Sequence, residues 1–353
     1  MKSSYIWLAS ALIVASCAIV AAATAGTSAH RASSTFRACM VTDGYPVDDR
    51  SFNQAAWQGI KSAQKTLGIQ GQYVVPSSQN AFAPTIESFI SRGCGIIVTV
   101  GFAMADVTKS EAAAHSKQRF AIVDNYYTPA IKNVEGLVYL TQQAAFLGGY
   151  LAAGMSKTHI VGTFSGMKIA PNLAYLDGFW DGVEYYNSVH HTSVKVLGWN
   201  EKTQNGVAVG NYSDIGAAQQ IATTMVGQGA DILFPVAGGP SLGAARVVKQ
   251  HGLKMIWFDV DGCVSAPQYC SYMIGSVTKV ISGTVAHAVA QAKNGSFHGG
   301  NYVGTLANGG VSLVYGKTLG KGVPSALKAE ITAVAKRIAS GKLKVASHYN
   351  PSS

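Results

Sequence analysis

The sequence lacks two short motifs, one typical of thiol redox enzymes and zinc ribbons and the other of zinc proteases. None of its five cysteines belongs to a C-x-x-C pair, and no H-E-x-x-H motif occurs. These absences argue against thiol redox catalysis, a zinc ribbon and the zinc-protease signature. The adjacent histidines His190 and His191 have no third ligand at helical spacing. We therefore expect neither a metal ion nor a cofactor.

Charged residues are also scarce. They make up 12% of the 353 residues. Hydrophobic residues make up 48%, a share that is typical of a folded globular chain. Lys and Arg number 27 and Asp and Glu 17, so the formal net charge is +10. The basic residues are scattered, with no aromatic-interleaved stripe, so we do not expect a nucleic-acid partner. The simpler explanation of the positive net charge is attraction to an anionic membrane surface or cell wall.

The amino-terminal segment has the composition of an export signal. Lys2 precedes a stretch from residue 3 to residue 29 that carries no charge, and its apolar part runs over residues 5–25. We assign residues 1–29 to a signal peptide or lipoprotein signal, outside the fold. The small residues before Cys17 favour its lipidation, whereas Ala23-Thr24-Ala25 offers an ordinary cleavage site. An uncleaved anchor is a third alternative.

Without Cys17, four of the five cysteines remain, an even set that suggests two disulfides in an exported protein. Cys39 lies in the first predicted strand and Cys94 begins the third, and these strands are neighbours in a sheet of order 2-1-3. Cys263 and Cys270 bracket a short loop. We therefore predict the pairs Cys39–Cys94 and Cys263–Cys270.

Strand-like and helix-like segments alternate along the rest of the chain. Continuous apolar runs such as residues 95–100 are typical of buried parallel strands. The pattern predicts an α/β fold with two doubly wound parallel-sheet lobes joined by several crossings. We place residues 36–137 and 262–305 in the first lobe, and residues 138–261 and 306–345 in the second.

The loop after the first predicted strand carries a dense set of polar and aromatic groups. Asp43 ends the strand, and Phe52 and Asn53 stand at the start of the next helix. Small ligands bind at such strand ends in open α/β sheets, although a plain helix cap at residues 48–51 explains the same residue types. Polar residues, aromatic residues or a glycine recur at six predicted strand ends: Asp43, Phe102, Asp124, Trp199, Gly238 and Asp259.

An enzymatic alternative arises at Gly239-Pro240-Ser241-Leu242-Gly243, which matches the G-x-S-x-G nucleophile elbow. Pro240 restricts the turn before the serine and no HGGG-type motif lies upstream, so we prefer a backbone that approaches a ligand closely. The acid and base of an esterase would be Asp259 or Asp261 and His287 or His298. The two acids equally suit a metal ion or ligand hydroxyl groups.

Five segments together form a specific signature: DDRSFNQAAWQG at 48–59, VTVGF at 98–102, AFLGGYLAAG at 145–154, AGG at 237–239 and FDVD at 258–261. With them, residues 37–345 resemble the basic membrane protein family of ABC-transporter lipoproteins, which includes purine nucleoside receptors. The resemblance implies a type I periplasmic-binding-protein fold with a hinged cleft. It also implies a nucleoside held by stacking and by hydrogen bonds to the ribose.

The resemblance further implies roles for individual residues. Phe52 and Trp199 would be the two stacking faces, and Asp124 would recognise the base. The other implied cleft residues are Asp43 and Asn53, with Gly238, Asp259 or Asp261, and Lys279 on the ribose side. The chain departs from the family pattern at Trp199-Asn200, where a Phe is usual, at Gly44-Tyr45-Pro46, and in the Cys263–Cys270 loop before Lys279.

These observations predict an exported receptor, tethered to the membrane or secreted, that catalyses no reaction. As a monomer it would capture a nucleoside, most readily a purine nucleoside, and deliver it to an ABC permease and its ATPase. A binding protein for a sugar or another small metabolite is the first alternative. A secreted esterase that uses Ser241 is the second.

Overall fold

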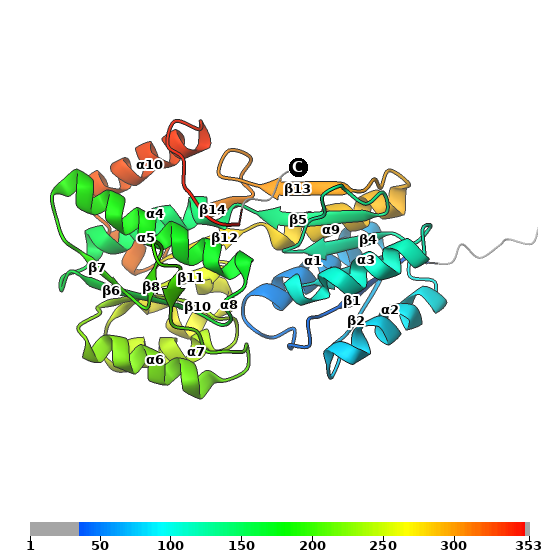
Figure 1. Cartoon of the computed structure of the whole chain (residues 1–353), viewed down its shortest axis with the longest axis horizontal. Helices are drawn as coiled ribbons and strands as arrows, with labels where there is room; N and C mark the ends of the chain where they lie inside the picture. The colour runs from blue at the N-terminus through cyan, green and yellow to red at the C-terminus, as the bar shows by residue number, and fades with distance from the viewer. Residues whose placement is uncertain (1–34, 350–353) are drawn as a thin grey trace, which may run out of the picture. The chain divides into compact units, whose positions relative to one another are not determined.

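Two six-stranded sheets organise residues 35–349, the part of the chain that the computed structural model describes (Figure 1). The first sheet has the order β13-β5-β4-β3-β1-β2, and all of its strand pairs are parallel. Its strands are β1 (Arg37–Val41), β2 (Gln70–Val74), β3 (Ile96–Val100), β4 (Phe120–Val123), β5 (Val134–Tyr139) and β13 (Gly300–Gly304). The predicted neighbours of β1, namely β2 and β3, are confirmed.

The second sheet has the order β14-β12-β11-β10-β6-β7. It is parallel except at the edge, where β14 runs antiparallel to β12. Its strands are β6 (Ile160–Ser165), β7 (Lys195–Leu197), β10 (Ile232–Val236), β11 (Lys254–Asp259), β12 (Met273–Lys279) and β14 (Val311–Tyr315). A short hairpin of β8 (Trp199–Asn200) and β9 (Asn205–Gly206) lies beside it.

Helices cover both faces of each sheet because successive strand residues point to opposite sides. In β1, Ala38 and Met40 pack in one core cluster, and Cys39 and Val41 pack in another. The first sheet lies between α1 (Phe52–Leu67) with α9 (Ile281–Asn294) and α2 (Phe82–Ser91) with α3 (Ala105–Ala114). The second lies between α4 (Thr141–Met155), α5 (Ala170–His190) and α10 (Ser325–Ala339) and the pair α6 (Ile215–Gly227) and α7 (Ser241–Gln250). The predicted fold class is confirmed: two doubly wound lobes.

The lobe boundaries differ from the prediction at one strand. Residues 262–305 were expected in the first lobe, but β12 hydrogen-bonds to β11 and β14 in the second sheet. The short helix α8 (Gly262–Ser265) and the Cys263–Cys270 loop supply the crossover between β11 and β12, so the chain leaves the second lobe only after Lys279.

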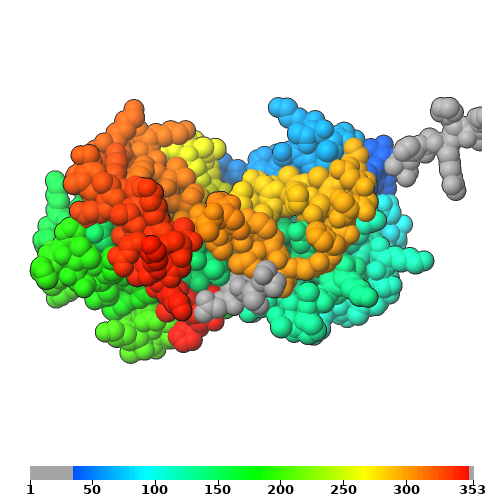
Figure 2. Space-filling model, turned by 90° about the horizontal axis from the view of Figure 1, so that it is seen from above, coloured from blue at the N-terminus to red at the C-terminus, as the bar shows by residue number. Residues whose placement is uncertain are grey.

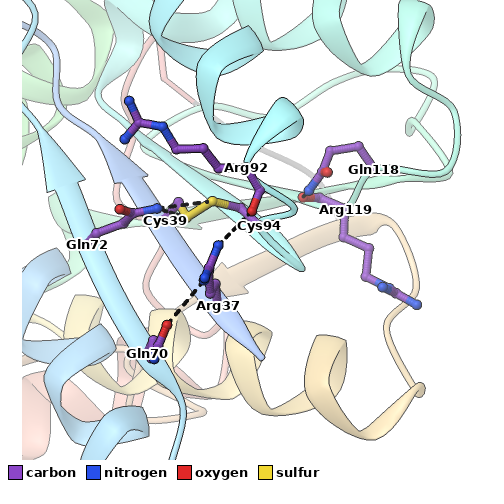
Figure 3. Close-up of a disulfide and its surroundings, with 8 residues drawn as sticks. All are labelled: Arg37, Cys39, Gln70, Gln72, Arg92, Cys94, Gln118 and Arg119. Carbon is purple, nitrogen blue, oxygen red and sulfur yellow. Dashed lines mark hydrogen bonds between the residues drawn. A yellow bond between two sulfur atoms is a disulfide. The ribbon is translucent and has the colours of Figure 1, made fainter. Parts of the chain in front are cut away.

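Both predicted disulfides are present. Cys39 on β1 is joined to Cys94, which stands just before β3, with Cα atoms 6.0 Å apart. Figure 3 shows the Gln72 side chain of β2 directed at these sulfurs, and its Nε2 lies 3.1 Å from the Cys39 Sγ. Cys263 and Cys270 close the loop beside α8, with Cα atoms 4.5 Å apart.

Helices α4 and α5 pack with their backbones unusually close, because glycines stand at the crossing. A Cβ on Gly149 would lie 2.0 Å from the Phe179 carbonyl oxygen, and a Cβ on Gly182 would lie 2.0 Å from that of Phe146. Gly149, in the 145–154 segment, therefore serves helix packing in the second lobe.

The carboxy-terminal segment, which is red in Figure 2, contacts both lobes. The Tyr349 ring is 5% exposed and lies 6.2 Å from the ring of Tyr126, which follows β4 in the first lobe. The Ser347 hydroxyl donates to Asp177 of α5 in the second lobe, at 3.0 Å. None of the helices within residues 35–349 has the length and apolar composition needed to cross a membrane.

Candidate functional site

A cavity of about 360 Å³ lies between the carboxyl ends of the two sheets. This position follows from the parallel strands, which direct their connecting loops to the same edge of each sheet. The first lobe lines the cavity with Asp43, Tyr45, Asp49, Phe52, Asn53, Phe102 and Asp124, among others. The second lobe contributes Met167, Asn172, Tyr212, Gly238, Phe258, Asp259 and Lys279, among others.

The loop at residues 43–53 combines a helix cap with cavity-lining groups. The Asp49 carboxylate accepts hydrogen bonds from the backbone N–H groups of Ser51, Asn53 and Gln54, at 3.0, 2.8 and 3.1 Å. These bonds satisfy free donors in the first turn of α1. Burial raises the pKa of Asp49 to about 6, and the three N–H groups oppose that rise. The helix-cap interpretation is therefore correct for Asp49, which also faces the cavity.

Within residues 35–349, no cationic side chain forms an ion pair with Asp43. Its Oδ1 accepts from the Asn53 side-chain amide at 3.2 Å. Burial raises the pKa of Asp43 to about 7, with a further rise from the Asp49 charge. Gly101 makes room for this carboxyl group, because a Cβ there would stand 2.9 Å from Asp43 Oδ2. A proton can thus occupy Asp43 near neutral pH.

A buried charge cluster links the two lobes at the floor of the cavity. The Lys279 Nζ, at the end of β12, lies 2.5 Å from Asp124 Oδ2 and 3.2 Å from Asp259 Oδ1. Burial lowers the pKa of Lys279, but the two carboxylates outweigh this and raise it overall. Burial also raises the pKa of Asp124, against the effect of the ammonium group. The lysine therefore remains charged.

The two aspartates occupy equivalent places in their lobes. Asp124 follows the last residue of β4, and Asp259 ends β11. Both have left-handed backbones, with φ of 62° and 61°, a region that Asp tolerates better than most residues. Such strain is concentrated at functional sites. In both lobes the turn directs the carboxylate toward Lys279.

Asp259 also accepts hydrogen bonds from both lobes. The hydroxyl of Ser51, from the first lobe, donates to its Oδ2 at 2.6 Å. The hydroxyl of Tyr175, from α5, donates to its Oδ1 at 2.8 Å. A ligand with adjacent hydroxyl groups would find an acceptor and a cationic donor together here.

Aromatic rings from both lobes border the cavity. The Lys279 ammonium lies 4.7 Å from the centroid of the Phe52 ring, within cation–π range. Tyr212 lies across from the first lobe, and its ring meets that of Tyr45 edge to face at 5.2 Å. The Asn172 amide donates to the Tyr212 hydroxyl at 2.6 Å, which helps to hold that ring against the wall.

Two predicted site residues do not line the cavity. The Trp199 ring is 3% exposed, and its Nε1 donates to Asp177 of α5 at 3.1 Å, so it faces the second-lobe core instead of the cleft. Asp261 caps α8 by accepting from the Cys263 N–H at 2.9 Å. The predictions for Trp199 as a stacking face and Asp261 as a ribose contact are corrected accordingly. The other predicted residues border the cavity: Asp43, Phe52, Asn53, Phe102, Asp124, Gly238, Asp259 and Lys279.

Three aromatic residues that line the cavity were not predicted as site residues: Tyr45, Tyr212 and Phe258. Tyr212 is the one whose surroundings carry a sequence signal. It lies in the loop between β9 and α6, in the segment Asn211-Tyr212-Ser213-Asp214. The Asn211 side chain accepts from the N–H groups of Ser213 and Asp214, which makes a tight turn before α6. An aromatic residue beside such a turn was a usable signal, but the strand before it is too short to predict.

The geometry around Ser241 does not suit an esterase. This serine is fully buried, and its hydroxyl donates to the Pro235 carbonyl and accepts from the Ala237 N–H. His287 on α9 and His298 before β13 are both exposed in the first lobe. Ser241 therefore stabilises the turn into α7, and Gly238, with φ of 61°, leaves room for the Tyr212 ring.

A cavity between two α/β lobes, with three crossings of the chain connecting them, is the arrangement of the type I periplasmic-binding-protein fold. Residues 36–347 match the Bmp family, described as PnrA-like ABC transporter substrate-binding proteins. The chain belongs to this family, whose members bind solutes and catalyse no reaction.

Two curated relatives are similar over most of their length. One is "Basic membrane protein A" of Borreliella afzelii, 28% identical over 305 residues, which cover 85% of this chain and 88% of the relative. Another is "ABC transporter nucleoside-binding protein BmpA" of Lactococcus lactis subsp. cremoris, 27% identical over 332 residues, which cover 86% and 89%.

A solved structure with the same fold is an ABC transporter solute-binding protein from Aeropyrum pernix K1. Its TM-score is 0.79 at 22% identity, over 89% of this chain and 94% of that chain. At this identity the likeness concerns the fold.

Proposed function

We propose that the cavity binds a nucleoside, preferably a purine nucleoside, and that the protein delivers it to an ABC permease and its ATPase. The observation that carries this proposal is the position of Lys279 between Asp124 and Asp259 beside the Phe52 ring. A ribose with two neighbouring hydroxyl groups can donate to a carboxylate and accept from an ammonium group. A heterocycle attached to it would meet the ring.

The rest of the cavity supports the same ligand class. Its volume of about 360 Å³ lies within the ~300–1,000 Å³ range of small-molecule sites. In our proposal Phe52 and Tyr212 border the base, in place of Phe52 and Trp199. Asp124, Asp43 and Asn53 then accept from or donate to the polar rim of the base, and Asp259 and Lys279 hold the ribose. The nucleoside-binding relative in Lactococcus lactis supports this assignment.

The test is calorimetric titration of the purified protein with matched ligands: inosine, guanosine, adenosine, uridine, hypoxanthine, ribose and glucose. We expect the purine nucleosides to bind most tightly and ribose alone to bind weakly. Tight binding of glucose or ribose with no binding of nucleosides would overturn the proposal in favour of a sugar receptor.

A matched pair of variants assigns the binding to this site. Asp259→Asn should weaken nucleoside binding at least tenfold, because it removes the charge that accepts from the ribose. Asp261→Asn alters a neighbouring aspartate outside the cavity and should leave the affinity unchanged. Equal effects of both substitutions would remove Asp259 from the ribose site.

We also propose that the protein is exported and held at the membrane by lipid on Cys17. This cysteine lies outside the described residues, and the proposal rests on the sequence around it. Incorporation of labelled fatty acid into the parent, and its loss in Cys17→Ala, would support tethering. Retention of label by the variant would contradict it.

A further inference from the structure

Three metal-ligating side chains meet on the first lobe, on helices α2 and α3. They are Glu87 of α2, Glu111 in the last turn of α3, and His115, which caps that helix. The His115 Nε2 lies 2.8 Å from Glu87 Oε1 and 3.6 Å from Glu111 Oε2. One ligand atom from each residue lies within 4.8 Å of the others. None of the three borders the cavity between the lobes.

Glu111 is the unusual member of this cluster. The residue is only 8% exposed, and its Oε2 is buried without a hydrogen-bond partner. Removing a carboxylate oxygen from water costs free energy unless a partner replaces the lost hydrogen bonds. The His115 Nε2 lies 3.6 Å from this oxygen, too far for a hydrogen bond. A bound cation would compensate for the burial of this carboxylate oxygen.

The separations match those of ligands around a small divalent ion. Bonds of about 2.0–2.1 Å in a tetrahedral arrangement place neighbouring ligand atoms roughly 3.3–3.4 Å apart. The distances from His115 Nε2 to the Glu87 and Glu111 carboxylate oxygens, 2.8 and 3.6 Å, lie on either side of that value. Small side-chain rotations would equalise them, and Glu87, with a side chain 49% exposed, is free to move.

The backbone around His115 is held firmly enough to support a ligand. The Asn133 side-chain amide donates to the carbonyl oxygens of Ala112, His115 and Gln118, at 2.9, 3.2 and 3.0 Å. The His115 N–H donates to the Glu111 carbonyl oxygen at 2.9 Å, which completes the helical turn between the two ligands. Glu111 and His115 are four residues apart, so they project from the same face of α3.

We propose that Glu87, Glu111 and His115 bind one Zn²⁺ ion, which ties α2 to α3 and leaves a fourth position for water. One imidazole nitrogen and two carboxylate oxygens form a ligand set that zinc accepts, and three protein ligands are characteristic of an open zinc site. The ion would stabilise the two helices that follow the cavity loops at residues 77–79 and 101–103. The sequence contains the signal as the pair Glu111 and His115, four residues apart on a helix, although Glu87 is remote in the chain.

The test is calorimetric titration of the purified, EDTA-treated and desalted protein with ZnCl₂. We expect one equivalent of Zn²⁺ to bind at micromolar or tighter affinity. Glu111→Gln, which keeps the size of the side chain, and His115→Ala should each weaken that binding at least tenfold. His251→Ala is the matched control, because His251 is an exposed histidine that caps α7 in the second lobe. It should leave the affinity unchanged.

Urea unfolding with and without ZnCl₂ provides a second measurement. Zinc should raise the midpoint of the parent and not that of His115→Ala, because a ligand that binds only the native state stabilises it. Matching midpoints of parent and variants without zinc would establish that the variants fold. Absence of stoichiometric binding by the parent, or parental affinity in both Glu111→Gln and His115→Ala, would overturn the proposal. Nucleoside binding is measured separately, so the two proposals can fail independently.

Discussion

The two walls of the cavity treat their buried carboxylates in different ways. On the first wall, Asp49 is held by three backbone N–H groups and Asp43 by one amide, and burial raises the pKa of each. On the second wall, Asp259 lies against the Lys279 ammonium and accepts two hydroxyl groups. The comparison indicates that Asp43 on the first wall can be protonated near neutral pH, whereas Asp259 on the second wall belongs to an ion cluster with Lys279 and Asp124.

The largest effect should follow from substitution of Lys279, whose ammonium group lies against Asp259 on the second wall. Lys279→Met leaves Asp124 and Asp259 buried beside each other without their positive partner. Removing one partner of a buried ion pair costs about 3–5 kcal/mol, because the other charge stays buried without compensation. The free energy of unfolding in urea should fall by that amount. Addition of Asp124→Asn to this variant should recover part of the loss. An unchanged urea midpoint in Lys279→Met would show that the cluster is not a stabilising pair.

The next effect concerns the aromatic ring beside that cluster. Phe52→Ala should weaken nucleoside binding tenfold to a hundredfold, since stacking of a base on an aromatic ring contributes about 1–3 kcal/mol. Phe102→Ala is the control, because its ring is 40% exposed where it borders the cavity. Calorimetry should give a smaller loss for Phe102. Parental affinity in Phe52→Ala would exclude this ring from stacking.

A smaller loss of affinity distinguishes Tyr212 from Trp199 as the stacking residue of the second lobe. Tyr212→Ala should weaken nucleoside binding about tenfold, the lower end of the stacking range. Trp199→Phe removes the indole donor to Asp177, which costs about 1–3 kcal/mol of stability and leaves the affinity unchanged. Paired titration and urea unfolding distinguish the two roles. The reverse result, loss of affinity only in the Trp199 variant, would restore the sequence prediction.

The smallest effect tests the titration of the first wall. The Asp43 pKa is raised from 3.8 to about 7, so the native state holds a proton that the unfolded state releases between about pH 4 and pH 7. This group therefore makes stability fall as pH rises through that window. Asp43→Asn removes the contribution, so the urea midpoint of the variant relative to the parent should rise over the same window.

Five other acids with raised pKa values titrate in both proteins: Asp49, Glu111, Asp124, Glu135 and Asp181. The difference between variant and parent isolates Asp43. A difference that does not change with pH would contradict the raised pKa.

Local sequence patterns predicted most of the strands and helices. Periodic spacing of apolar residues indicates an element with one buried face, and a continuous apolar run indicates a strand that is buried on both faces. They also identified Asp43, Phe52 and Asn53, which lie within one short loop, and the disulfide between the neighbouring strands of Cys39 and Cys94. The sequence pattern failed for β12, since strand order depends on which partner a strand meets across the sheet. It failed for Trp199 because a strand end does not specify which way its side chain turns.

The amino-acid sequence by itself therefore determined the α/β class, the disulfide partners and the contiguous first wall of the cavity. These features depend on interactions between residues that are near in the chain or on adjacent strands. Only the tertiary structure decided that Lys279 stands between Asp124, 155 residues away, and Asp259, and that Glu87 meets Glu111 and His115. Such clusters depend on how separate elements pack, because the balance of burial, charge and hydrogen bonding arises only when distant side chains share one volume.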